Sequence, residues 1–174
     1  MFRWLLLLLV TGSGYAAHPG FLLPFLGGDS TWPTHQVIRQ MSEWINCSDD
    51  ATLTKWCSDE FRYYKLKVWG EVKEDAQGNI ASLTLNAPYS SYNWSQFQLA
   101  LRKDGFKINH ITIGDAQFSV AEELLQSTHQ QVDKSLVLFL NQSRSQFPKR
   151  IDFQYGQVIA KLETDGDEVY LKFA

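Results

Sequence analysis

Residues 151–173 read IDFQYGQVIAKLETDGDEVYLKF, and this stretch decides the fold class. We interpret the runs 151–155, 158–162 and 169–173 as three strands, each bounded by turn residues. Asp165-Gly166, between the last two runs, is a strong β-hairpin signal. The stretch therefore predicts an antiparallel meander.

A second hairpin is predicted earlier in the chain. From Tyr63 to Lys73 the side chains alternate between two faces, and Gln77-Gly78-Asn79 supplies a turn before a returning strand. One face of this pair should meet solvent, as antiparallel sheets allow. The apolar face is expected to hold Tyr64, Leu66, Val68 and Val72, with Leu83, Leu85 and Ala87 on the returning strand, and the polar face Lys65, Lys67, Glu71 and Lys73.

Helical periodicity appears in four segments. Residues 34–46 repeat apolar residues on one face, and residues 51–59 follow an N-terminal signal at Ser48-Asp49-Asp50. Residues 94–104 end at Gly105, and residues 120–141 open with a capping box of Ser119 and Glu122. The stripe of this last helix is expected to hold Leu124, Leu125, Val132, Leu136 and Phe139.

With a strand at 106–113, the element order becomes ααββ-α-β-α-βββ. Helices and strands alternate only in the middle of this order. We therefore expect an α+β fold, with a mostly antiparallel sheet and helices packed on one face.

Length and composition indicate one ordinary globular domain. The chain has 174 residues, of which 44% are hydrophobic and 20% charged, and its formal net charge is −3. Removing residues 1–16, whose one charged side chain is Arg3, changes this charge to −4. Because positive charge is nowhere concentrated, we expect no nucleic-acid partner.

The first sixteen residues have the pattern of a cleavable signal peptide. Arg3 precedes an apolar run from Trp4 to Val10, and Gly14 and Ala16 stand at the −3 and −1 positions of a cleavage site. A membrane span needs about 20 apolar residues, so a stable anchor is the weaker alternative. We predict one domain at 17–174, with an irregular lead-in at 17–33. It should be extracytoplasmic: periplasmic in a bacterium, otherwise secreted.

Cys47 and Cys57 are the two cysteines of the chain. In an oxidising compartment such a pair normally forms a disulfide, and closing this loop would stabilise the fold by about 3 kcal/mol. The spacing suits neither a zinc site nor a C-x-x-C redox pair. We expect the bond to join the first two helices.

Candidates for chemistry are weak. His110 is followed by Gly114-Asp115, and a histidine with a nearby aspartate could act as a base and its orienting partner. His129 and Asp133 lie one helical turn apart, but a single pair makes a poor metal site. A strand-ending turn and a solvated helix flank are the more ordinary explanations of these residues, so we expect no cofactor.

The segment Pro88-Tyr89-Ser90-Ser91-Tyr92-Asn93-Trp94-Ser95 is the strongest candidate for recognition. Tyr89, Tyr92 and Trp94 combine with small polar residues, the composition of adaptable binding surfaces. Alternatively, Trp94 heads the apolar face of a helix and Tyr89 folds back on the sheet. Asn46, Asn93 and Asn141 fit the N-x-[ST] glycosylation pattern, whose use depends on the organism.

Three functions follow from these features. The leading hypothesis is an exported, disulfide-containing, non-enzymatic interaction protein of the cell envelope, either an accessory or assembly factor or an inhibitor of another exported protein. A ligand-binding module with a pocket near Tyr89–Trp94 is the second. A small exported hydrolase using His110, with Asp115 or Asp152, is the third. Perturbed carboxylates around His110 would favour the hydrolase, an apolar pocket the binding module, and a filled core with an exposed apolar patch the interaction protein.

Overall fold

The computed structural model describes residues 19–26, 32–48, 54–142 and 145–174. Within these ranges the chain forms ten strands and six helical segments. The strands are β1 (Ile45–Asn46), β2 (Lys55–Cys57), β3 (Phe61–Tyr63), β4 (Leu66–Glu74), β5 (Ile80–Pro88), β6 (Lys107–Ile113), β7 (Ala116–Ser119), β8 (Lys149–Tyr155), β9 (Val158–Thr164) and β10 (Glu168–Phe173). The helices are η1 (Gly20–Leu22), α1 (Leu23–Leu26), α2 (His35–Gln40), α3 (Ser91–Lys103), α4 (Val120–Leu124) and α5 (His129–Gln142).

The strands form one antiparallel sheet. Their order is β1-β2-β4-β5-β10-β9-β8-β6-β7, and β3 pairs with β4 outside this path. The predicted meander is β8-β9-β10, the predicted hairpin is β4-β5, and β10 pairs with β5 to join them. This confirms a mixed α+β protein with a large antiparallel sheet.

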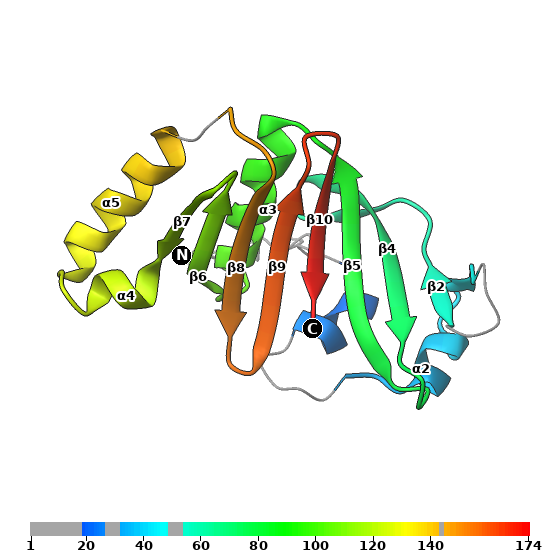
Figure 1. Ribbon diagram of the computed structural model, residues 1–174. Helices are drawn as coiled ribbons and strands as arrows, with labels where there is room; N and C mark the ends of the chain where they lie inside the picture. Colours follow the sequence, from blue (N-terminus) through cyan, green and yellow to red (C-terminus); the bar gives the residue numbers. More distant parts are fainter. Residues whose placement is uncertain (1–18, 27–31, 49–53, 143–144) are drawn as a thin grey trace, which may run out of the picture.

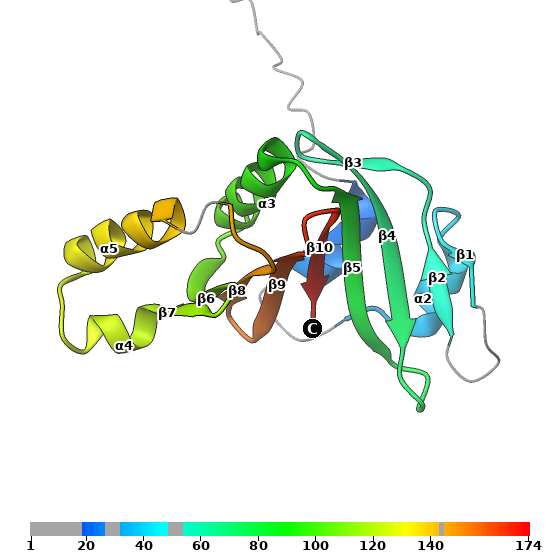
Figure 2. The ribbon, with the colours of Figure 1, turned by 45° about the horizontal axis from the view of Figure 1, so that its top comes forward.

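The sheet has a covered face and an open face. In Figure 1, α3, η1 and α1 lie behind the sheet, and no helix of the described residues stands in front of β5, β8, β9 or β10. Figure 2 places α5 on the same side of the sheet as α3, beyond edge strand β7. The covered face holds the core, which includes Val72, Leu85, Phe97, Leu101, Phe153, Leu162, Leu171 and Phe173.

The N-terminal half differs from prediction in three places. The first helix ends at Gln40, and residues 45–46 are a strand. The predicted helix at 51–59 is wrong, because residues 55–57 form β2; residues 49–53 lie outside the described ranges. Pairing with β4 overrides local helix signals here, since it buries Trp56, whose Nε1 donates to Glu74 Oε1 at 2.7 Å.

Tyr64 is the third difference in this half. It was expected on the apolar face of a strand but occupies the turn between β3 and β4, with φ of 55°. The disulfide itself is confirmed, with Cys47 and Cys57 Cα atoms 5.8 Å apart. The bond crosses the β1–β2 pair, so the expectation that it would join two helices is wrong.

The predicted long helix at 120–141 is two helices. Ser119 caps α4 as expected, because its hydroxyl accepts a hydrogen bond from Glu122 N. A second capping box opens α5: Thr128 Oγ1 accepts from Gln131 N, and Gln131 Oε1 accepts from Thr128 N at 3.0 Å. This second box explains the break, and it leaves Leu125, expected in the apolar stripe, 85% exposed.

The lead-in at 17–33 contains ordered structure. Its described residues 19–26 form η1 and α1, and Leu22 and Phe25 are fully buried. The predicted irregular conformation is therefore wrong for this part, which belongs to the core. The predicted signal peptide, residues 1–16, lies outside the described residues. Among the helices that the structure describes, none is long and apolar enough to span a membrane.

Candidate functional site

The segment around Tyr89–Trp94 is held in place by hydrogen bonds. Ser90 caps α3 by accepting from Asn93 N, and Asn93 Nδ2 donates to Pro88 O at 2.9 Å. Tyr89 N donates to Asp167 O in the β9–β10 turn. Most of the predicted loop is therefore the first turn of a helix fixed to the sheet.

The three aromatic residues of this segment have different environments. Trp94 is 8% exposed and belongs to the core. Tyr89 is half-buried, with its ring centroid 5.2 Å from that of Phe147. Tyr92 is 55% exposed. The recognition hypothesis therefore rests on Tyr92 and the open side of Tyr89.

A groove of about 360 Å³ lies between α3 and α5, and we call it the α3–α5 groove. Both helices lie on the covered side of the sheet (Figure 2). The groove is lined by Tyr89, Ser91, Trp94, Ser95 and Gln98 from the start of α3, Leu140 and Asn141 from the end of α5, Ile113 from β6 and Lys149 from β8.

The lining mixes apolar and polar groups. Trp94, Ile113 and Leu140 supply apolar surface, while Gln98 and Asn141 supply amides. The polar groups on α3 are partly engaged: Ser95 Oγ donates to Ser91 O, and Gln98 Nε2 donates to Trp94 O. The groove can therefore accommodate an apolar group that carries a hydrogen-bonding edge.

Lys149 is the charged residue of the groove. Its side chain is nearly buried, with Nζ 4.6 Å from the ring centroid of Phe147 and 6.0 Å from that of Tyr89. Aromatic faces attract an ammonium group, so these rings help to hold the charge where water is scarce. Sequence reasoning missed Lys149, because the contact depends on the path of residues 145–149 over the sheet.

Exposed apolar side chains flank the groove. Tyr92 and Leu99 are seven residues apart on α3, hence on one side, and both adjoin Ser95, which lines the groove. On α5, Val137 projects between Leu140 and Asn141, because successive residues turn by about 100°. Both helices that form the groove, α3 and α5, therefore carry exposed apolar side chains next to its opening.

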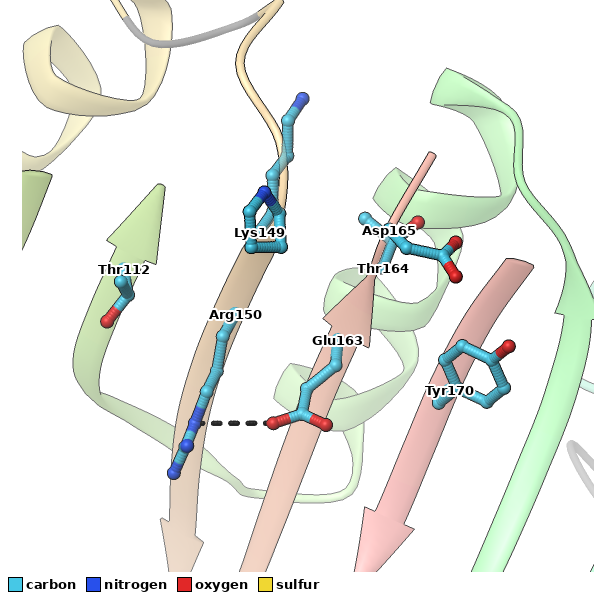
Figure 3. Close-up of a pocket in the computed structure, with 8 residues that line it drawn as sticks. Thr112, Lys149, Arg150, Glu163, Thr164, Asp165 and Tyr170 are labelled. Carbon is cyan, nitrogen blue, oxygen red and sulfur yellow. Dashed lines mark ion pairs between the residues drawn. The ribbon is translucent and has the colours of Figure 1, made fainter. Parts of the chain in front are cut away.

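A second cavity, of about 410 Å³, lies on the open face over β8, β9 and β10 (Figure 3). Its centre is Arg150, whose Nε lies 2.8 Å from Asp152 Oδ1 and 3.5 Å from Glu163 Oε1. Hydrogen bonding to Asp152 is the main cause that raises the pKa of Arg150. The cavity is lined by Thr112, Pro148, Lys149, Arg150, Glu163, Thr164, Asp165 and Tyr170.

The structure separates His110 from Asp115. His110 pairs in register with Ser119 on one side and Asp152 on the other, whereas Asp115 lies in the turn after β6. No hydrogen bond joins His110 to an acidic group in the described residues, and both carboxylate oxygens of Asp152 accept from Arg150.

His129 and Asp133 are exposed on the polar side of the first half of α5, whose other side buries Val132. The described residues contain no cluster of three His, Cys, Asp or Glu side chains that could hold a metal ion. Of the three glycosylation patterns, Asn46 is exposed, Asn93 donates to Pro88 O, and Asn141 lines the α3–α5 groove.

Comparisons of the chain with protein-family models, with curated proteins and with solved structures each find no match.

Proposed function

We propose that the protein is an exported, non-enzymatic interaction protein of the cell envelope that binds another exported protein through the α3–α5 groove. The observation that carries this proposal is the exposed apolar rim, formed by Tyr92, Leu99 and Val137, beside a groove with a nearly buried cation. Such a combination of an aromatic anchor, apolar surface and polar lining is typical of protein interfaces.

The dimensions of the groove favour one inserted side chain of the partner. An apolar or aromatic side chain would contact Trp94, Ile113 and Leu140, and its backbone would reach the amides of Gln98 and Asn141. Tyr92 would then pack against the partner outside the groove, where a large, rigid side chain loses little conformational entropy on binding.

Two features support export. Residues 1–16 have the signal-peptide pattern, and the Cys47–Cys57 bond suits an oxidising compartment. A small-molecule ligand in the same groove is the second candidate function. It is favoured by the volume of about 360 Å³, which falls within the range of known ligand pockets.

Site-specific photo-crosslinking tests the proposal. A photoreactive residue at position 92, 99 or 137 should capture the same envelope protein in living cells. The same residue at Leu125, which is more exposed but lies at the end of α4, before α5 begins, should not capture it. With that protein purified, Tyr92→Ala should weaken binding at least tenfold, which corresponds to about 1.4 kcal/mol. Equal capture from position 125, or no capture at all, would contradict the proposal.

A further inference from the structure

We infer that the open face of the sheet carries a second, separate binding site, which takes a neutral, extended oligosaccharide. The site consists of Trp69 on β4, Asn86 on β5 and Tyr170 on β10, which we call the Trp69–Tyr170 row. In the strand register Asn86 pairs with Trp69 on one side and with Tyr170 on the other. The three side chains therefore form one line across three neighbouring strands.

The row faces away from the helices. Its members alternate along their strands with buried core residues, Val68 and Gly70 on β4, Leu85 and Ala87 on β5, and Val169 and Leu171 on β10. Figure 3 shows Tyr170 on the side of the sheet opposite α3. The row thus lies on the face that no helix covers in front of β5 and β10 in Figure 1.

Asn86 is the observation that points to a ligand. Its side chain is only 8% exposed, yet its amide makes no hydrogen bond within the described residues. Among those residues, every fully enclosed side-chain polar atom has a hydrogen-bond partner except Trp44 Nε1. Because the amide of Asn86 has no partner and is not among the enclosed atoms, it must reach the surface. An amide offers two donors and two acceptor sites, and here they open between two aromatic side chains.

The spacing fits a chain of sugar rings. Trp69 and Tyr170 are separated by two strand spacings, about 9.5 Å. This separation is on the order of one disaccharide repeat in an extended glycan. The C–H faces of sugar rings stack on aromatic faces, and a hydroxyl or acetamido group between them would meet the amide of Asn86.

The charges beside the row indicate a neutral ligand. On the β4 side, Glu71 forms ion pairs with Lys73 at 2.9 Å and with Lys55 at 3.6 Å. On the β8–β9 side, Arg150 pairs with Asp152 and Glu163. The paired groups, three basic and three acidic, carry no net charge together. The carboxylates of Glu168, Asp165 and Asp167 act on Tyr170 and disfavour an anion there, so a neutral ligand suits the face better than an acidic one.

The Arg150 cavity extends the row. Tyr170 pairs with Glu163, Glu163 with Arg150, and Arg150 with Thr112 in the same register. Their polar side chains line the cavity of about 410 Å³ and provide donors and acceptors beyond Tyr170 (Figure 3). A fourth and a fifth sugar ring could occupy this continuation, after the three rings over Trp69, Asn86 and Tyr170.

Calorimetric titration of the mature protein tests the inference, with cellohexaose and chitohexaose as extended probes and maltohexaose as a curved one. At least one extended probe should bind, and maltohexaose should bind at least tenfold more weakly. Trp69→Ala and Tyr170→Ala should each weaken binding at least tenfold, and Asn86→Ala severalfold. Tyr92→Ala, an exposed tyrosine on the other side of the sheet, should leave sugar binding unchanged.

Further measurements separate a loss of sugar binding from a loss of folding. Thermal melts show whether each variant is folded, and Trp69→Phe, which keeps an aromatic face, should retain most of the affinity. In the wild-type protein the Trp69 indole N–H resonance should shift on titration. Absence of binding by both extended probes, or binding unaffected by the Trp69 and Tyr170 variants, would overturn the inference. Loss of the envelope partner in Trp69→Ala without any sugar binding would assign this face to protein recognition instead.

Discussion

The indole of Trp44 lies directly against the backbone of Gly70. A Cβ atom placed on Gly70 would stand 2.7 Å from Cη2 of Trp44 and 3.1 Å from Oγ of Ser58. The same ring makes an edge contact with Phe21, whose centroid lies 5.6 Å away. Gly70 therefore lets the segment before β1 pack on the middle of β4.

Gly70→Ala should lower the free energy of unfolding by about 1–3 kcal/mol, the usual cost of overpacking a core. Urea titration followed by far-UV circular dichroism measures this change. Gly20→Ala is the matched control, because a Cβ atom there meets nothing within 4 Å. An equal effect of the two substitutions would show that the Trp44 contact does not limit the space at Gly70.

Tyr63 and Tyr64 both donate hydrogen bonds to Asp104 at the end of α3, Tyr63 to Oδ2 at 2.7 Å and Tyr64 to Oδ1. Burial is the main cause that raises the pKa of both phenols, and Asp104 adds to it. A group with a raised folded-state pKa contributes its full stability below the unfolded value, near 10. That stability is lost as the pH rises above about 10.

The double variant Tyr63→Phe/Tyr64→Phe should therefore lose less stability than the wild type between pH 9 and pH 11, within the range where phenols of ordinary pKa near 10 titrate. At neutral pH the variant should be less stable, since each hydrogen bond to a charged acceptor contributes about 1.5–3 kcal/mol. Melting temperatures measured from pH 7 to pH 11 give both effects. Parallel curves for the two proteins would exclude these phenols as the source of alkaline destabilisation.

The disulfide gives a third prediction. Cys47→Ser/Cys57→Ser should lower the free energy of unfolding by about 3 kcal/mol, because the loop is no longer closed in the unfolded chain. Thiol labelling of the denatured, non-reduced wild-type protein should modify neither cysteine. Labelling of both would show that the protein lacks the bond.

Export itself is tested by the N-terminus of the mature chain. Full-length protein expressed in an exporting cell should be recovered outside the cytoplasm with Ala17, or a residue next to it, as its first residue. Mass spectrometry of the purified protein gives this end directly. An intact Met1 on membrane-bound protein would contradict signal cleavage and restore the anchor.

Tyr92 and Trp94 should behave differently although they are two residues apart. Tyr92→Ala should change stability by no more than about 0.5 kcal/mol, as exposed substitutions usually do. Trp94→Ala should cost about 3–5 kcal/mol, because Trp94 is 8% exposed in the core. Chemical denaturation measures both. A loss of several kcal/mol in Tyr92→Ala would show that Tyr92 belongs to the core and is not an anchor.

The sequence predicted correctly those turns and helix caps whose hydrogen bonds join residues close together in the chain. The β9–β10 turn is one example: Asp165 Oδ1 accepts from Asp167 N and Glu168 N, and Gly166 has φ of 110°. The cap that Ser119 forms on α4 is another. Both depend on contacts within a few residues, which the sequence pattern contains.

The secondary structure was predicted wrongly where contacts between residues distant in sequence determine the conformation. Trp56 lies in a strand because it pairs with β4 and its indole donates to Glu74, which is 18 residues further along the chain. The helix signals in the residues before it therefore gave the wrong prediction. The break before α5, in contrast, is encoded locally, in the capping box that Thr128 and Gln131 form.

The candidate sites depend on strand order, which periodicity does not contain. Tyr89 and Trp94 were expected near a pocket, but α5 and Lys149, which complete the groove, come from later in the chain. Trp69 and Tyr170 are about a hundred residues apart, and only the insertion of β10 beside β5 aligns them through Asn86.

That insertion also sets when the protein can finish folding. β10 lies between β5 and β9, so residues 168–173 join two parts of the sheet that otherwise share no strand pairing. During synthesis these residues leave the ribosome after all the other described strands. Until then the emerging chain has two unjoined hydrogen-bonding edges and an incomplete core. We therefore expect the sheet to close only after residues 168–173 have emerged.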